Sequence, residues 1–157
     1  MKPKSLLAGW LVDGSGGPVR ENVLLTIENG TITHIAEAIP EKIRNQEIID
    51  FSHCSLLPGL IDAHIHLFMS GTEDLYIREK QLRLSFEDVI GGMEERLGDL
   101  AACGIVACRD GGDRHAYTMQ YKRDHLDRNV FPLQLKVAGA AWHQHGRYGK
   151  MIGKSPG

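Results

Sequence analysis

A short apolar segment, residues 60–67, constrains this chain most, because it carries three ionisable side chains in the sequence LIDAHIHL. Side chains at positions i, i+2 and i+4 of a β-strand share one face, so Asp62, His64 and His66 are predicted to point the same way. The residues predicted to be buried by helices on the other face are Ile61, Ala63, Ile65 and Leu67. Three ionisable groups on an otherwise buried strand are costly without a partner. The pattern therefore favours a metal ion held by the two imidazoles, and the alternative is a pair of hydrogen-bonded histidines at a strand end.

The order of predicted elements after residue 58 is strand, helix, strand, helix, strand. The predicted strands cover residues 60–67, 105–110 and 133–141, and a helical turn is predicted within 73–82. The first full helix is predicted to begin after Ser85, which forms a variant capping box with Asp88, and to end at Gly104. The second is predicted over residues 114–127. This alternation is typical of parallel strands joined by crossover helices, which predicts the α/β class.

Residues 1–57 are predicted to form a small antiparallel β-sheet unit. The strongest signal is Asn29-Gly30, which supplies the two positive-φ residues of a type I′ turn in a hairpin over residues 22–37. The apolar stretch over residues 5–12 has the length of a signal-peptide core. The turn DGSGG that follows it lacks a cleavage-site pattern, so a first strand is favoured. A further short strand is predicted over residues 47–51.

Composition and charge narrow the class of protein. The 157 residues carry a formal net charge of −2 and are 42% hydrophobic, which excludes a disordered chain. The lack of a basic excess argues against nucleic acid as a partner, and no apolar run approaches the ~20 residues that span a bilayer. The three cysteines are widely spaced without a CxxC pair, so free thiols in the cytoplasm are expected. The glycine clusters GSGG and DGGD match no phosphate-binding pattern and predict turns.

Several segments, in order along the chain, resemble the amidohydrolase superfamily of metal-dependent hydrolases. The most specific is LLPGLIDAHIHL (56–67), which is similar to the first barrel strand of that family. The supporting segments are VDGSGGPV (12–19), ENGTITHIAE (28–37), EIIDFSHCSLLPG (47–59), CGIVACRDGG (103–112) and GAAWHQHGRYG (139–149). The resemblance covers nearly the whole chain and points to the dipeptidase-like or imidazolonepropionase-like branch.

This resemblance implies an incomplete (β/α)8 TIM-like barrel preceded by a small β-sandwich part. Residues 1–57 would belong to the sandwich, and residues 58–157 would hold the first three barrel strands. By the same resemblance, His64 and His66 ligate a divalent metal, usually zinc. In the family the other ligands, and the aspartate that acts as general base, come from later strands, so the general base is expected outside this chain. A whole barrel needs about 250 residues, more than the 157 present.

Three residues at strand ends are predicted to bind substrate, namely His143, His145 and Arg109. The two histidines follow the third predicted strand, at the end where barrel enzymes keep their active sites. Two solvated loop histidines are the alternative, and a zinc site built from both histidine pairs is a weaker one. Arg109 with Asp110 would hold a substrate carboxylate or brace the metal site, although a structural ion pair or turn cap is favoured. Cys108 is predicted to be a packed thiol, not a ligand or nucleophile.

The favoured function is that of the N-terminal part of a metal-dependent amidohydrolase. It would hydrolyse a C–N bond in a small amide or dipeptide-like molecule with metal-activated water. Deamination is the rival within the superfamily, because the same metal site serves both reactions. A second alternative is a truncated, inactive fragment that folds as an oligomer or with a complementing polypeptide, since three parallel strands leave open edges. A small α/β binding module is the third, and neither nucleic acid nor a membrane is an expected partner.

Overall fold

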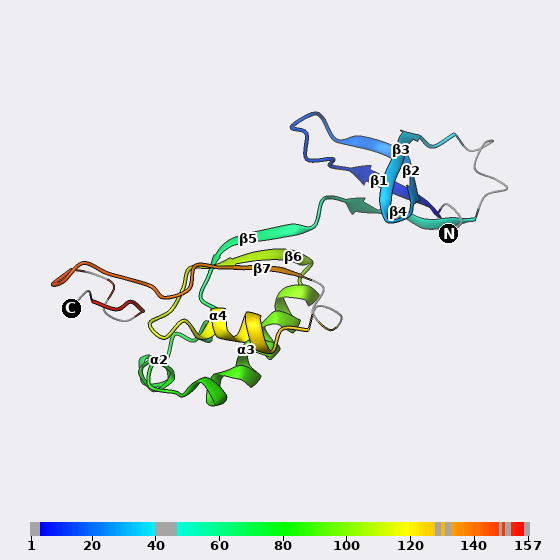
Figure 1. Ribbon diagram of the computed structural model, residues 1–157. Coiled ribbons are helices and arrows are strands. Elements are labelled where there is room, and N and C mark those ends of the chain that lie inside the picture. Colours follow the sequence, from blue (N-terminus) through cyan, green and yellow to red (C-terminus); the bar gives the residue numbers. More distant parts are fainter. Residues whose placement is uncertain are drawn as a thin grey trace. The chain divides into compact units, whose positions relative to one another are not determined.

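The computed structural model describes residues 4–39, 47–127, 130, 133–147, 149 and 152–155. The chain divides into two compact units, Met1–Pro58 and Gly59–Gly157, and each has its own hydrophobic core. The first unit is built of strands, and the second combines strands with helices (Figure 1). The helices in the described ranges are too short or too polar to traverse a lipid bilayer.

The first unit is a four-stranded sheet with the order β3-β2-β1-β4. Its strands are β1 (Lys4–Leu11), β2 (Arg20–Glu28), β3 (Thr31–Glu37) and β4 (Ile48–Leu56). The predicted first strand and hairpin are confirmed. β2 and β3 pair antiparallel, and Asn29 and Gly30 have φ angles of 51° and 79°. Val23 and Leu25 alternate on β2 and are each 1% exposed, so one face of the hairpin forms the core of this unit.

The prediction of a purely antiparallel sheet over residues 1–57 is wrong for β4. This strand pairs parallel with β1 at the edge opposite β3, and it continues to Leu56, beyond the predicted end at residue 51. Both sides of β2 are occupied by β1 and β3, so β4 can only join at an outer edge of the hairpin sheet, and it pairs with β1. Parallel neighbours need a longer connection than a tight turn, and β2 and β3 lie between β1 and β4 in the sequence.

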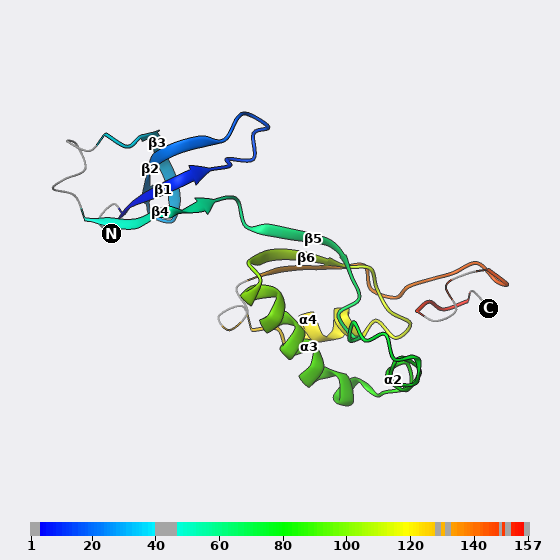
Figure 2. The same ribbon diagram turned by 180° about the vertical axis from the view of Figure 1, so that it is seen from behind.

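The second unit is a parallel sheet of order β5-β6-β7 with α3 and α4 on one of its faces (Figures 1 and 2). Its elements are β5 (Leu60–Ile65), α2 (Leu75–Gln81), α3 (Phe86–Ala102), β6 (Ile105–Asp110), α4 (Tyr117–Asp124) and β7 (Gln134–Val137). The predicted alternation of strands and helices after residue 58 is therefore confirmed. Because parallel strands run the same way, the ends of β5, β6 and β7 lie at one edge of the sheet.

Helix α3 forms where its sequence signals predict it. The Ser85 hydroxyl accepts from the Asp88 amide and the Asp88 carboxylate accepts from the Ser85 amide, which completes the capping box. Gly104 follows the helix with φ 81°, a left-handed conformation that suits glycine. The buried face of α3 packs into a core shared with the sheet and α4. Its buried members are Phe86, Val89, Met93 and Leu97.

Helix α4 and strand β7 are shorter than predicted, and β5 ends at Ile65, two residues before its predicted end. Helix α4 begins at Tyr117, not near residue 114, because the buried Asp113 carboxylate accepts from the Tyr117 and Thr118 amides and so caps the first turn. Ala116, directly before the helix, has a left-handed φ of 59°. Strand β7 ends at Val137, not at residue 141, and Gly139 turns the chain with φ 84°.

The regular alternation predicted for residues 60–67 is interrupted. The pairing of β5 with β6 shifts register between Leu60 and Ile61 and again between Asp62 and Ile65. Ile61 is 71% exposed and Ala63 is also exposed, whereas Ile65 and Leu67 contribute to the core. The apolar positions nearest the end of the strand are the ones that the helices cover.

The Tyr121 hydroxyl suggests a stabilising substitution. Its oxygen is buried, and it is the one buried side-chain polar atom in the described residues that has no hydrogen-bond partner. Replacing Tyr121 with phenylalanine is expected to raise the free energy of unfolding by about 1 kcal/mol, because an unsatisfied buried hydroxyl costs about 1–3 kcal/mol. Urea unfolding of the two proteins measures the difference. A fall in stability would contradict the expectation.

Candidate functional site

The imidazoles of His64 and His66 face each other where β5 ends. Their Nε2 atoms are 3.4 Å apart and their ring planes are inclined by 76°. The His64 ring is exposed, whereas His66 is half-buried. His66 Nδ1 lies 2.8 Å from the Gly112 carbonyl oxygen, which only accepts, so Nδ1 carries the proton and Nε2 presents a lone pair. The structure therefore brings the two predicted metal ligands together with their Nε2 atoms directed at one region.

The spacing of the two Nε2 atoms fits a shared metal better than a direct hydrogen bond. A tetrahedral zinc with Zn–N bonds of about 2.0–2.1 Å places two nitrogen ligands about 3.3–3.4 Å apart. Hydrogen bonds to nitrogen donors are ordinarily about 2.7–3.2 Å long, shorter than the 3.4 Å observed. The contact of Nδ1 with a backbone carbonyl is also typical of a metal-binding histidine. These residues fit a divalent metal as two of its ligands.

Gly111 leaves room beside the two rings. A Cβ atom at this position would lie 3.0 Å from His66 Cε1 and 3.3 Å from His64 Nε2. The Gly111 amide donates to the Ile65 carbonyl at 2.8 Å, which fixes the turn after β6 against the end of β5. The sequence predicts only a turn at DGGD, and the space for the imidazoles is seen only once β5 and β6 are paired.

The other acidic and thiol groups near this pair do not complete a metal site. Among the described residues, no three His, Cys, Asp or Glu side chains gather closely enough to hold a metal ion. The Asp62 carboxylate accepts from the His64 amide at 3.0 Å, so it supports the backbone of the strand. Cys108 is 2% exposed, and burial, followed by the charges of Asp110 and Asp62, raises the pKa of its thiol to about 11. The prediction of a packed, inert Cys108 agrees with this burial and protonation.

His143 and His145 lie apart from the first histidine pair and line a separate pocket of about 520 Å³. This pocket also carries Arg114 and Lys154. The His143 amide donates to the Lys154 carbonyl at 2.9 Å, and His145 Nδ1 lies 3.3 Å from Ser155 Oγ. The alternative of one zinc site built from all four histidines is therefore wrong, because these four side chains, all within the described ranges, do not form a cluster.

Arg109 and Asp110 adopt different roles at the end of β6. Arg109 is exposed, and its Nη1 donates to the Ala63 carbonyl on β5 at 3.4 Å. Asp110 is fully buried and accepts from the Leu67 and Gly112 amides at 2.9 and 2.8 Å. The two side chains do not pair with each other, so the prediction of an ion pair between Arg109 and Asp110 is wrong. The prediction of a turn cap is confirmed for Asp110, which accepts from the Gly112 amide. Burial raises the pKa of Asp110 in spite of these hydrogen bonds.

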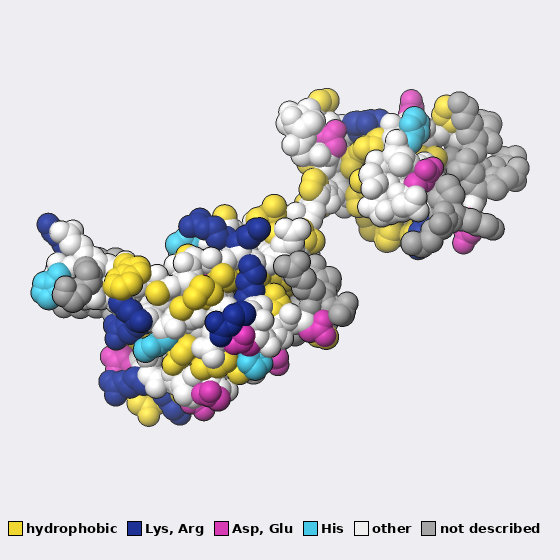
Figure 3. Space-filling view, viewed as in Figure 1, with side chains coloured by type: hydrophobic (Ala, Val, Ile, Leu, Met, Phe, Trp, Pro, Cys, Tyr) yellow, Lys and Arg dark blue, Asp and Glu magenta, His cyan; other side chains and the backbone are white. Residues whose placement is uncertain are grey.

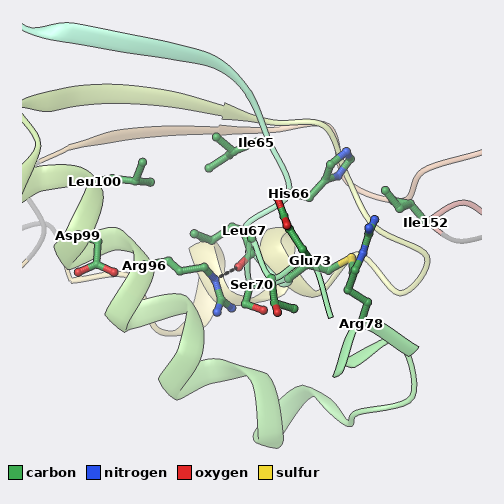
Figure 4. Close-up of a pocket in the computed structure, with 13 residues that line it drawn as sticks. Ile65, His66, Leu67, Ser70, Glu73, Arg78, Arg96, Asp99, Leu100 and Ile152 are labelled. Atoms are coloured by element: carbon green, nitrogen blue, oxygen red, sulfur yellow. Dashed lines mark hydrogen bonds between the residues drawn. The ribbon is translucent and has the colours of Figure 1, made fainter. Parts of the chain in front are cut away.

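A pocket of about 640 Å³ adjoins His66 on the side of the loop after β5 (Figure 4). Arg96 enters it from α3, and its Nε donates to the Leu67 carbonyl at 2.7 Å. Burial lowers the pKa of the Arg96 guanidinium. Glu73 and Arg78 lie at the other end of the pocket, near His66 and Ile152. The sequence does not single out Arg96, because there it is one more charged residue of a helix.

The comparisons with known proteins find an imidazolonepropionase by sequence, and a dipeptidase and a deaminase by structure. No model of a protein family matches the chain. Over 114 residues it is 37% identical to imidazolonepropionase of Bacillus cereus (strain B4264), which covers 71% of this chain and 25% of that protein. The structure is similar to an Xaa-Pro dipeptidase with bound methionine, with a TM-score of 0.66, 19% identity and coverage of 90% of this chain and 34% of that one. E. coli guanine deaminase gives a TM-score of 0.68 at 14% identity, covering 99% and 39%.

The chain therefore spans between 16% and 25% of the length of the first curated relatives it matches. The structural likenesses lie below 25% identity and show a shared fold. The sequence likeness to imidazolonepropionase extends over 71% of the chain. Taken together with the paired histidines at the end of β5, the sequence likeness and the shared fold support the assignment of the chain to the amidohydrolase superfamily.

Proposed function

We propose that the chain provides two metal ligands, His64 and His66, of an enzyme that hydrolyses a C–N bond in a small amide or dipeptide-like molecule. The observation that carries this proposal is the 3.4 Å separation of the two Nε2 atoms, which suits a shared ion such as zinc. A divalent metal bound there supplies Lewis-acid polarisation of the scissile carbonyl and activation of water. In this proposal residues 58–157 hold the first three strands of a (β/α)8 barrel and residues 1–57 belong to a small β-sandwich part.

The residues of this chain hold and orient groups in the proposed reaction. Gly112 fixes the His66 ring through Nδ1, and the Gly111 position leaves space at the paired Nε2 atoms. The proton that the attacking water loses must go to a base. We place that general base on later barrel strands, because the two histidines are occupied as ligands.

The pocket around His143 and His145 supports a substrate that bears a carboxylate. Its charged lining side chains are Arg114 and Lys154, both cationic, and the two histidines add further donors. Arg109, exposed at the end of β6, is a further proposed contact for substrate. Dipeptides and acylated amino acids carry a carboxylate and guanine does not, so this lining favours amide hydrolysis over deamination.

We also propose a cytoplasmic location. Cys54, Cys103 and Cys108 are all free thiols in the structure, as the sequence predicts. Unpaired cysteines persist in a reducing compartment.

Turnover of a substrate panel by the zinc-loaded protein, extended to include the later barrel strands, tests the proposed reaction. The panel contains Xaa-Pro dipeptides, acylated amino acids, imidazolonepropionate and guanine. Hydrolysis confined to the members with a carboxylate is the expected result, and His143→Ala should raise KM for them more than it lowers kcat. Turnover of guanine alone would contradict the proposal and favour the deaminase.

An assembling, inactive chain is the second candidate, and exposed apolar side chains favour it. Hydrophobic side chains lie on the surface of both units (Figure 3). In the second unit they include Leu60, Ile61, Val106 and Trp142, of which Ile61 is 71% exposed. Such residues on a sheet with open edges suit pairing with another copy or a complementing polypeptide. Zinc binding without turnover of any panel member, in a chain that sediments as an oligomer, would favour this candidate.

A further inference from the structure

His66 is held at two points by the segment that follows β6. Its Nδ1–H donates to the Gly112 carbonyl at 2.8 Å. The next residue along the chain, Leu67, donates its amide to the Asp110 carboxylate at 2.9 Å. The ring and the backbone of His66 are thus fixed by residues only two positions apart.

The Asp110 carboxylate connects both contacts. Its Oδ2 accepts from the Leu67 amide, and its Oδ1 accepts from the Gly112 amide at 2.8 Å. The Thr118 hydroxyl donates to Oδ2 at 3.3 Å and orients the carboxylate from α4. Asp110 is 0% exposed, so water does not compete for these hydrogen bonds. One buried side chain therefore ties the backbone that follows His66 to Gly112, the residue whose carbonyl accepts the hydrogen bond from the His66 ring.

We propose that Asp110 is a positioning residue for His66, which it holds in the Nδ1–H tautomer by fixing the Gly112 carbonyl. The lone pair of Nε2 is then directed toward Nε2 of His64, ready to bind a metal. Groups that orient a ligand in this way typically contribute about 10–100-fold to metal affinity. This inference rests on the proposed role of His66 as a ligand, but the tautomer is a property of the metal-free chain.

Asp113 offers a matched control. It is 1% exposed and accepts hydrogen bonds at both oxygens, as Asp110 does. Its donors are the amide of His115, just before α4, and the amides of Tyr117 and Thr118, the first two residues of α4. These donors differ from the Leu67 and Gly112 amides that Asp110 binds. Thr118 contacts both carboxylates, with its amide on Asp113 and its hydroxyl on Asp110. Asp113→Asn therefore perturbs a buried carboxylate of the same unit while leaving in place the Leu67 and Gly112 amides that tie Asp110 to the His66 site.

The experiment compares Asp110→Asn with Asp113→Asn. In D110N the side-chain amide keeps one acceptor oxygen and presents an NH₂ group to the other backbone donor. One of the two hydrogen bonds from the Leu67 and Gly112 amides is therefore lost. The ¹⁵N shifts of the His66 ring in the metal-free chain report the tautomer, and competition with a chromophoric chelator reports zinc affinity. D110N is expected to lose the fixed Nδ1–H tautomer and about 10–100-fold in zinc affinity, and D113N is expected to keep both. Equal losses in both variants, or an unchanged His66 ring in D110N, would overturn the proposal.

A milder variant covers the case in which D110N does not fold. Thr118→Val removes the hydroxyl that orients the carboxylate but keeps the shape of a fully buried side chain. It should shift the His66 ring in the same direction by a smaller amount, and an unchanged ring in folded T118V would overturn the inference. If the unmodified chain binds no zinc at His64 and His66, the proposed function fails, while the tautomer shift in D110N still supports the role of Asp110.

Discussion

Replacing both His64 and His66 with alanine is expected to abolish zinc binding by the chain. The two imidazoles present Nε2 atoms 3.4 Å apart, and no larger cluster of metal-ligating side chains exists among the described residues. Removal of both rings therefore eliminates the two ligands whose spacing suits zinc. Metal analysis after dialysis, together with chelator competition, measures the loss.

The matched control for this variant is His143→Ala with His145→Ala. It also removes two imidazoles, but from the separate pocket beside Lys154 and Ser155. This control is expected to keep the zinc content of the unmodified chain. Equal zinc content in H64A/H66A and the unmodified chain would refute the assignment of the ligands.

Gly112→Ala is expected to give the largest loss of stability among single substitutions in the turn after β6. Gly112 has φ 89°, and its added Cβ would lie 2.6 Å from the Gly139 carbonyl oxygen. Left-handed backbone at a non-glycine residue costs about 1–3 kcal/mol, and the clash with backbone adds to that cost. Thermal and urea unfolding should show the loss, and a stability equal to that of the unmodified chain would contradict the steric conflict between residues 112 and 139.

Gly111→Ala is expected to lower zinc affinity without lowering the stability of the fold. Gly111 lacks the positive φ of its neighbour, so alanine meets no backbone penalty there. Its Cβ would face His66 Cε1 at 3.0 Å and His64 Nε2 at 3.3 Å. Stability is expected to stay near that of the unmodified chain, while zinc affinity falls about 10–100-fold as the rings are displaced. Retention of full zinc affinity would show that the rings bind metal away from this space.

Much of the local structure could be predicted from the sequence because each signal acts over a few residues. The Asn29-Gly30 turn, the capping box of Ser85 and Asp88, and Gly104 at the end of α3 are all confirmed. Each depends on one backbone conformation or one side-chain contact with a near neighbour. The parallel order of β5, β6 and β7 follows from the same local signals, since connecting helices leave the strands running the same way.

Features that depend on distant pairing could not be predicted. The parallel match of β4 with β1, and not with the other free edge at β3, joins strands that are distant in the sequence, and no local pattern states it. The exposure of Ile61 and the register shifts of β5 against β6 are both features that strict alternation cannot anticipate. For the candidate site, the spacing of the histidine pair predicts its two members. The support from Asp110, Gly111 and Gly112 appears only when β5 and β6 lie together.

Each of the four consecutive residues Asp110–Asp113 has a different structural role. Asp110 supplies a buried carboxylate, Gly111 an absence of side chain, Gly112 a carbonyl at a left-handed backbone, and Asp113 a helix cap. A one-residue insertion or deletion here would displace all four at once. Anyone who recombines this chain with a relative should therefore take residues 60–67 and 110–113 from the same parent. The two segments depend on each other's contacts and should be inherited together, although more than forty positions separate them in the sequence.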